Sequence, residues 1–345
     1  MQANHSRRRF FIIALAGLAL AVLGVIRVRQ WLLTPFGGEA APTPTPATFT
    51  AASTAEPVAG FGVMGDSLSD EYRADNNRGE PYTATTLNWM EQLVLRRGLN
   101  FGEWGARDEP RRAGYEYNWA RASATAHSLI ESGQHLGLAR QVANGEVSHV
   151  LMWVGANDFA IWNGTYKEIY DGALSDDALQ AKVEGMIADI TLAVDTVLAA
   201  GPVRMVVVTI PDISITPDTI LTFPNQAGRQ RAAGAIAEVN AAVVALADSR
   251  DIVVVDANGA LAVLQPRFDK LGNIHIGGEL INFFAKGNEP HNGRLDDVVG
   301  HPGTALSGLL ANIVFVEPFD AHYGLNITLL SDNEILEDAG LRLAP

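Results

Sequence analysis

From Val58 onward the sequence alternates short apolar runs with longer amphipathic stretches, and this alternation constrains the fold more than any other feature. Four runs have the length and composition of buried strands: Val58–Met64, His149–Val154, Val203–Ile210 and Ile252–Val255. Three further stretches carry apolar residues at helical spacing: Thr86–Arg97, Asp176–Ala200 and Gln226–Ala247. Strands that alternate with helices form a parallel sheet with helices on both faces. The sequence therefore predicts a doubly wound α/β domain with a mostly parallel sheet.

The residues before Val58 do not share this pattern and divide into two segments. Three arginines at positions 7–9 precede an uncharged run from Phe10 to Ile26, which as a helix would be about 26 Å long, just enough to cross a membrane. No small-residue cleavage site follows this run directly, so we favour an uncleaved membrane anchor over 1–33 to a removed signal peptide. Residues 34–57 are rich in Pro, Thr and Ala and cannot bury enough apolar surface to fold, which indicates a linker.

The rest of the chain is long enough for one large α/β domain. We assign 58–316 to this domain and 317–345 to a peripheral C-terminal extension. The chain has no cysteine, which excludes disulfides, thiolate zinc sites and cysteine nucleophiles. Its formal net charge of −14 argues against nucleic-acid binding, because an acidic surface repels a phosphate backbone. A chain without cysteine suits either compartment, so the location is predicted from the N-terminal segments alone: a domain tethered to the membrane outside the cytoplasm, or a secreted one.

Polar residues follow the first two predicted strands, at the edge where parallel sheets bind ligands. Ser67 follows the first strand in the sequence Gly-Asp-Ser-Leu, which puts a hydroxyl at that edge, although such a sequence is also a common turn. Asn157 follows the next strand in the sequence Gly-Ala-Asn-Asp. Its amide could donate a hydrogen bond to a developing oxyanion, or could simply cap a turn.

A histidine late in the chain has a setting that the other histidines lack. His301 precedes Pro302 and an apolar stretch, Ala305–Phe315, that we expect to be a helix beginning near this proline. An imidazole titrates near neutral pH, which is what a serine hydroxyl needs of its general base. A nearby carboxylate could hold the required tautomer and stabilise the imidazolium.

In this order along the chain, these motifs resemble those of the SGNH, or GDSL, hydrolase family over residues 58–315. The resemblance implies a three-layer α/β/α fold of the flavodoxin-like kind, with Ser67 as nucleophile and His301 as general base. It also implies an oxyanion hole made by the backbone N–H groups of Ser67 and Ser123 and by the Asn157 side chain. No metal or organic cofactor is expected.

The sequence departs from the family pattern at two places. Ser123 stands where the family has a glycine, so its N–H can serve only if its backbone angles permit. The family spacing Asp-x-x-His would put the acid at position 298, which is a valine. Asp297, four residues before His301, is our first choice for the acid. Asp296 is nearly as plausible, and a backbone carbonyl could instead orient the ring.

These observations predict a serine ester hydrolase that acts on a small-molecule, lipid or glycan ester. Two alternatives stay open: an acyltransferase that acts on cell-surface glycans, and a non-catalytic surface-binding module with a relic site. A nucleotide-binding domain is disfavoured, because no glycine-rich phosphate loop follows the first strand. We also expect Gly272–Asn282 to form a small hairpin near the His301 loop.

Overall fold

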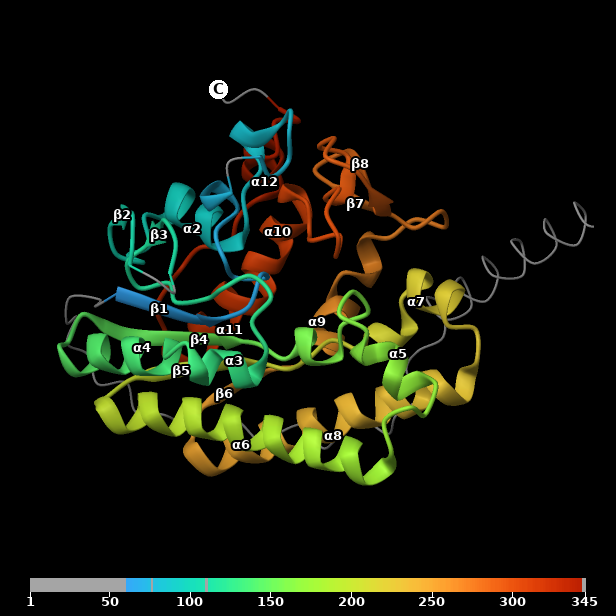
Figure 1. The fold of residues 1–345 in the computed structure, drawn as a ribbon. Coiled ribbons are helices and arrows are strands. Elements are labelled where there is room, and N and C mark those ends of the chain that lie inside the picture. Colours follow the sequence, from blue (N-terminus) through green and yellow to red (C-terminus); the bar gives the residue numbers. More distant parts are fainter. Residues whose placement is uncertain (1–59, 76, 109–110, 343–345) are drawn as a thin grey trace, which may run out of the picture. The chain divides into compact units, whose positions relative to one another are not determined.

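The computed structural model describes residues 60–75, 77–108 and 111–342. The predicted anchor (1–33) and the predicted linker (34–57) lie outside these residues, so both remain predictions. Four parallel strands form the central sheet in the order β1-β4-β5-β6 (Figure 1). They are β1 (Gly60–Gly65), β4 (Val147–Trp153), β5 (Arg204–Val208) and β6 (Val253–Val255). These strands occupy the four apolar runs of the sequence, so the predicted parallel sheet is confirmed.

Helices cover both faces of this sheet, as Figure 1 shows. Those packed on one face are α3 (Ala126–Glu131), α4 (Gln134–Ala143), α5 (Thr165–Tyr170), α6 (Asp176–Ala200) and α8 (Gln226–Arg250). Those packed on the other face are α2 (Trp89–Arg97), α9 (Ala257–Val263), α10 (Thr304–Leu310), α11 (Glu317–Tyr323) and α12 (Asp332–Asp338). Along β5, Val206 and Val208 face the second group of helices, while Met205 and Val207 face the first. Because successive strand residues point to opposite faces, a continuous apolar run contributes side chains to two separate cores, one on each face of the sheet.

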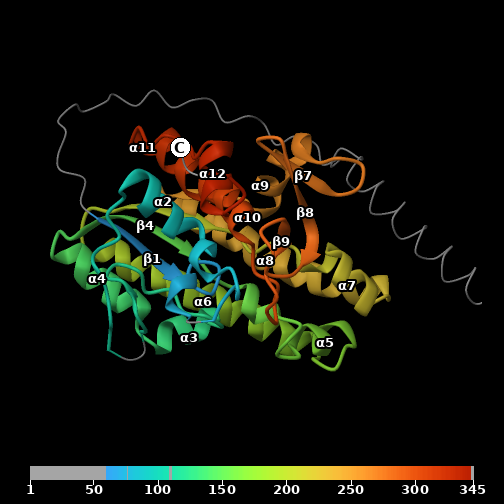
Figure 2. The ribbon, with the colours of Figure 1, turned by 90° about the horizontal axis from the view of Figure 1, so that it is seen from above.

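A second, smaller sheet lies between α9 and α10 in the sequence. It consists of β7 (Asn273–Ile276), β8 (Glu279–Lys286) and β9 (Asn292–Arg294), and β7 and β8 pair antiparallel. The hairpin predicted over Gly272–Asn282 is therefore present, and β9 extends it. Figure 2 shows this small sheet on the same side of the molecule as α7 (Pro217–Thr222). An ion pair between Arg294 and Asp218, 2.6 Å long, joins the two.

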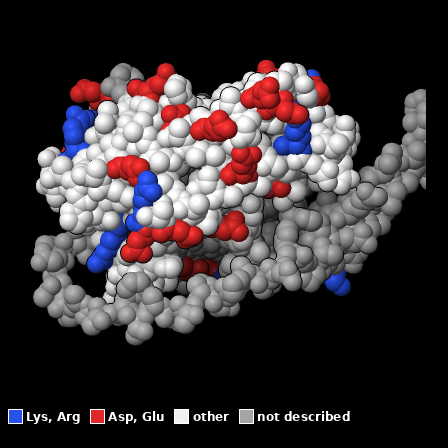
Figure 3. All heavy atoms as spheres, turned by 90° about the horizontal axis from the view of Figure 1, so that it is seen from below, with Lys and Arg blue, Asp and Glu red and all other residues white. Residues whose placement is uncertain are grey.

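One described helix, α8, is long and apolar enough to cross a membrane by length and composition. Its buried residues include Ile236, Val239 and Val243, which pack with the sheet and α6, so α8 is a core helix. Its other face carries charged residues. Figure 3 shows the side of the molecule that α6 and α8 form, where acidic side chains are widely spread.

The segment from Glu317 onward, which we expected to be a peripheral extension, contributes to the core. Phe319, Ile335 and Leu336 are fully buried in the cluster that also holds α2 and α10. The predicted helix at Ala305–Phe315 is α10 followed by a π-helical stretch, Ala311–Val316, which continues directly into α11. The continuous helix carries the chain across the sheet, so the residues that follow fill the space beside α2.

Candidate active site

Ser67 lies in a tight turn immediately after β1. The main chain turns there because the Ser69 and Asp70 N–H groups both donate to the Asp66 carbonyl, at 3.0 and 3.1 Å. Gly65 ends the strand so close to β4 that a side chain would collide with the Trp153 carbonyl oxygen. Ser67 is buried, and its hydroxyl makes no hydrogen bond with another residue in the described part of the chain. The hydroxyl is therefore not committed to a structural contact.

The segment that leads to Ser123 runs along the outer edge of β1. A parallel bridge joins Val63 to Asn118, and the Arg121 N–H donates to the Gly65 carbonyl at 3.0 Å. Ser123 has a φ of +68°, in the left-handed region that favours glycine. A glycine would adopt this angle without strain, so the angle is compatible with the glycine that the family resemblance implies at this position, although the residue here is a serine.

Asn157 follows β4 on the other side of β1, in a short turn of 3₁₀ helix, Ala156–Phe159. Its side chain is buried, and its Nδ2 donates to the Ala124 carbonyl at 3.0 Å. Next to it, Asp158 accepts from the Ala126 N–H at 2.9 Å. These two contacts tie the Ser123 segment to the end of β4. One Nδ2 hydrogen of Asn157 remains for another acceptor, since an amide nitrogen carries two.

Asp297 holds the His301 ring. Its Oδ2 lies 2.7 Å from the ring Nδ1, and its Oδ1 accepts from the N–H groups of Gly300 at 2.6 Å and His301 at 3.2 Å. Asp296 is exposed, and its side chain makes no hydrogen bond with another described residue. Of the sequence alternatives, the structure therefore brings Asp297 to the ring, not Asp296.

The charge state of this pair follows from its surroundings. Burial of Asp297 opposes ionisation, but the His301 ring and two N–H donors outweigh it and lower the pKa of Asp297 to about 2. The carboxylate is thus ionised at neutral pH and fixes the ring proton on Nδ1. The other ring nitrogen, Nε2, is buried and has no hydrogen-bond partner among the described residues.

The His301 loop packs against the turn that follows Ser67. Tyr72 donates from its hydroxyl to the Pro302 carbonyl at 3.0 Å, and its ring centre lies 6.3 Å from that of His301. This contact puts His301 on the same side of the sheet edge as Ser67. No hydrogen bond joins the two side chains in the part of the chain that the structure describes. Such contacts often tighten only when substrate binds.

Buried carboxyl groups next to these residues hold their protons unusually strongly. Burial raises the pKa of Asp66 to about 7 and that of Asp158 to about 6, in each case with a smaller contribution from neighbouring carboxylates. Burial also raises the pKa of Glu71 to about 8. Near neutral pH these groups are partly protonated, so they repel a developing oxyanion less than three full charges would.

Sequence reasoning missed several residues that hold this region together. Asp70 is buried and accepts from the Ala122 N–H at 2.6 Å and from Arg112 at 2.7 Å. Tyr72 makes the contact to Pro302 described above. Both follow Ser67 closely, but nothing in a single sequence separates such residues from an ordinary polar turn. Their partners lie tens or hundreds of residues away.

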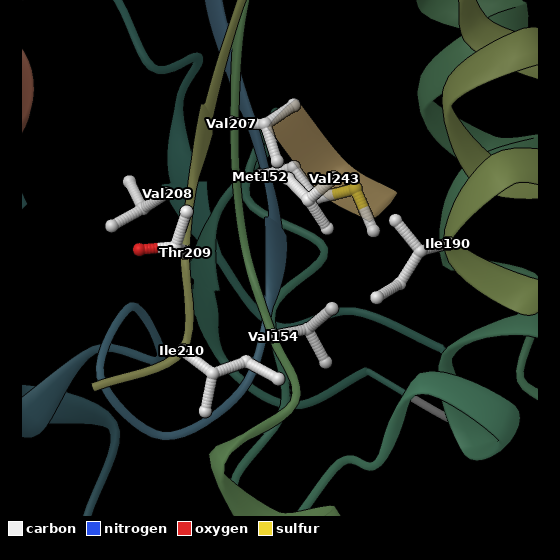
Figure 4. A pocket seen from close by; sticks show the side chains of 8 residues that line it. All are labelled: Met152, Val154, Ile190, Val207, Val208, Thr209, Ile210 and Val243. Atoms are coloured by element: carbon white, nitrogen blue, oxygen red, sulfur yellow. The ribbon is translucent and has the colours of Figure 1, made fainter. Parts of the chain in front are cut away.

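A small pocket elsewhere in the domain is part of the core. Figure 4 shows it between the sheet and α6 and α8, lined by Met152, Val154, Ile190, Val207, Val208, Thr209, Ile210 and Val243. All but Thr209 are apolar, and none is a predicted site residue. The Thr209 hydroxyl already accepts from the Ala257 N–H at 2.9 Å, and the lining includes neither Ser67 nor His301, so we do not assign chemistry to this pocket.

Residues 61–311 match the family model described as GDSL-like lipase/acylhydrolase. The chain belongs to this family. The family resemblance inferred from the motifs is thereby confirmed. The predicted enzyme class, a carboxylic ester hydrolase, is confirmed with it. No curated protein matches the chain.

Several solved structures are similar at low identity. A family 3 carbohydrate esterase from Talaromyces cellulolyticus is 14% identical and covers 78% of this chain and 100% of its own, with a TM-score of 0.40. A variant of an acetyl xylan esterase from Geobacillus stearothermophilus is 12% identical and covers 79% and 98%, with a TM-score of 0.41. An extracellular lipase from Streptomyces rimosus is 13% identical and covers 77% and 100%, with a TM-score of 0.39.

Proposed function

We propose that this GDSL-family hydrolase cleaves its ester through Ser67 as nucleophile and His301 as general base. The single observation that carries the proposal is the state of the His301 ring. Its Nδ1 is bound to Asp297, while its Nε2 is buried without a partner among the described residues. A buried polar atom without a partner calls for an explanation, and a role in catalysis is one. A ring held in this tautomer keeps the lone pair of Nε2 free to accept a proton, as a general base for Ser67 must.

In the proposed mechanism, Nε2 of His301 takes the hydroxyl proton of Ser67 as the oxygen attacks the ester carbonyl. Asp297 stabilises the resulting imidazolium through Nδ1. The imidazolium then gives its proton to the departing alcohol, which leaves an acyl group on Ser67. A water molecule, deprotonated by Nε2, hydrolyses this acyl-enzyme and restores the free hydroxyl. The steps conserve charge and need no further reactant.

The oxyanion of each tetrahedral intermediate is proposed to bind the N–H groups of Ser67 and Ser123 and the Nδ2 of Asn157. The left-handed backbone of Ser123 and the tie between Asn157 and Ala124 support this assignment. Loss of one such donor typically costs about 3 kcal/mol of transition-state stabilisation. Removing the Asn157 amide with Asn157→Ala should therefore lower kcat by about 100-fold.

A fluorophosphonate probe tests the nucleophile directly. We expect the wild-type protein to be labelled, with the label on the peptide that contains Ser67. Ser67→Ala should abolish labelling, and His301→Ala should reduce it strongly, while Ser69→Ala, altered two residues away, should be labelled normally. Labelling that persists in Ser67→Ala, or a wild-type protein that is folded but unlabelled, would contradict the proposal. The second outcome is what a non-catalytic binding module would give.

The kind of ester is the next question, and a series of p-nitrophenyl esters of increasing chain length addresses it. Turnover of the acetate alone would favour deacetylation. Turnover of longer chains would favour lipid-like substrates. Adding sugars as acceptors to the trapped acyl-enzyme distinguishes hydrolysis from acyl transfer, since a transferase would release acylated sugar faster than free acid.

We further propose that the domain works outside the cytoplasm, held at the membrane by residues 1–33. The basic residues at 7–9, the apolar run after them and the proline-rich segment at 34–57 support this location. In intact cells, an added protease should remove the domain and leave the N-terminal segment in the membrane fraction. A domain that is degraded only after the cells are lysed would contradict the proposed location.

A further inference from the structure

The turn between Asp297 and His301 is one residue longer than the spacing that the family resemblance implies. Asp297 nevertheless reaches the ring, because the turn closes on its carboxylate through the N–H groups of Gly300 and His301. Gly300 has a φ of +75°, which a side chain would disfavour. The other two residues between Asp297 and His301, Val298 and Val299, are 79% and 51% exposed and cannot fix the turn by packing. Besides these hydrogen bonds, the contact that remains to hold the turn is the one at Gly300.

Arg294 lies against Gly300. A Cβ atom added to Gly300 would come within 2.9 Å of the Arg294 Nε and 3.2 Å of its Nη2, so the guanidinium fills the space where that atom would be. The main chain next to Arg294 also holds the other side of the histidine. Arg294 forms a β-bridge with Pro302, and the Leu295 N–H donates to the His301 carbonyl at 2.8 Å. The residues before and after His301 are thus both held from the end of β9.

The Arg294 side chain is itself fixed in place. Its Nη2 lies 2.6 Å from Oδ2 of Asp218 on α7, in the connection that follows β5. The side chain of Arg294 is only 22% exposed, and its Nε is buried without a hydrogen-bond partner among the described residues. A buried donor without a partner lowers stability, so hydrogen bonding alone does not explain why the guanidinium lies against this turn.

We propose that Arg294 is a positioning residue for His301, an inference that rests on the proposed function of this site. The guanidinium, anchored by Asp218, supports Gly300 in its left-handed conformation. This support keeps Nδ1 of His301 on Asp297 and keeps Nε2 directed toward Ser67. The longer turn can then place the imidazole as a shorter one would. Arg294 acts through His301 and does not touch the reacting atoms.

The test compares Arg294→Ala, Arg294→Lys and Asp218→Asn with the matched control Arg267→Ala. Arg267 also belongs to the segment between α9 and α10 and pairs with an aspartate, Asp332, at 2.8 Å, but it joins that segment to α12 and not to the turn. Turnover of a p-nitrophenyl ester gives kcat and KM. Proton NMR gives the Nδ1–H resonance of His301, identified by its loss in His301→Ala. Thermal unfolding shows whether each variant folds.

We expect Arg294→Ala to lower kcat by about 10- to 100-fold with KM changed less than about threefold, because a small displacement of the base is costly. Asp218→Asn should lower kcat by about two- to fivefold, as befits loss of a half-exposed ion pair. Arg294→Lys should recover part of the activity. Arg267→Ala should keep kcat within about twofold even where its Tm falls. The Nδ1–H resonance should shift or broaden in Arg294→Ala and stay in place in the control.

Wild-type kcat in Arg294→Ala, or an equal loss of kcat in Arg267→Ala, would overturn the proposal. If Arg294→Ala does not fold, unchanged kcat and an unchanged Nδ1–H resonance in both Arg294→Lys and Asp218→Asn would overturn it as well. If the wild-type protein hydrolyses no ester, the proposed function fails, and the NMR comparison still tests the positioning of the ring.

Discussion

The choice between two adjacent aspartates gives the sharpest test of the site. Asp297→Asn keeps the size of the side chain and leaves Oδ1 able to accept from the Gly300 and His301 N–H groups. It removes the carboxylate that holds the proton on Nδ1 and stabilises the imidazolium. In a well-studied serine hydrolase triad this change lowers kcat by about 10⁴-fold. We expect about 10²- to 10⁴-fold here, measured with a p-nitrophenyl ester at pH 7.

The same substitution has a calculable effect on stability. The Asp297 pKa is about 2, against an ordinary value of 3.8, and this difference corresponds to at most about 2.4 kcal/mol. Because the side chain is 26% exposed, solvent screening reduces the contribution to about 1 kcal/mol. A lowered carboxyl pKa stabilises the fold above pH 4, and this stability is lost as the pH falls from about 4 to about 2. Urea unfolding should therefore separate wild type from Asp297→Asn at pH 7 and bring them together near pH 2.

Asp296→Asn is the matched control. It makes the same chemical change one residue earlier, at an exposed side chain without hydrogen bonds to other described residues. Its kcat should stay within about twofold of wild type, and its unfolding free energy within about 0.5 kcal/mol. A loss of kcat in Asp296→Asn as large as that in Asp297→Asn would refute the geometric argument. So would an Asp297→Asn variant with wild-type turnover.

Three further predictions concern the backbone and the buried carboxyl groups. Ser123→Gly should raise the unfolding free energy by up to about 1 kcal/mol while leaving kcat within a few-fold, because φ at this position is +68°; a decrease in stability would contradict this account. Gly65→Ala should abolish folding or activity, since its side chain would collide with the Trp153 carbonyl, and a stable active variant would disprove the close approach. Glu71→Gln should raise the Tm at pH 8, because burial raises the pKa of Glu71 to about 8 and ionisation there opposes folding. That gain in Tm should shrink as the pH falls toward 4.5, where the unfolded state also binds the proton. A gain that grows at low pH would contradict a raised pKa for Glu71.

The sequence by itself determined the layers of the fold and the edge at which the site lies. In β4, β5 and β6 at least three consecutive residues are apolar, and β1 holds only glycine and apolar residues; only a strand covered on both faces needs such an unbroken run. Ser67 and Asn157 follow two of these strands directly, so local order along the chain was enough to put them at one edge. These features depend on residues only a few positions apart, so the pattern of apolar and polar residues along the sequence is enough to predict them.

Only the tertiary structure decided which aspartate meets His301 and what the last part of the chain does. Asp296 and Asp297 differ by one position, and the choice depends on the left-handed turn at Gly300 and on Arg294, neither of which the Asp-to-His spacing reveals. The segment after Glu317 resembled an addition in the sequence because it follows the last family motif. Phe319 and Leu336 nevertheless fill the core beside α2, more than 200 residues earlier in the chain. Contacts between segments so far apart depend on how the whole chain packs, and a single sequence does not state which of its apolar residues will meet.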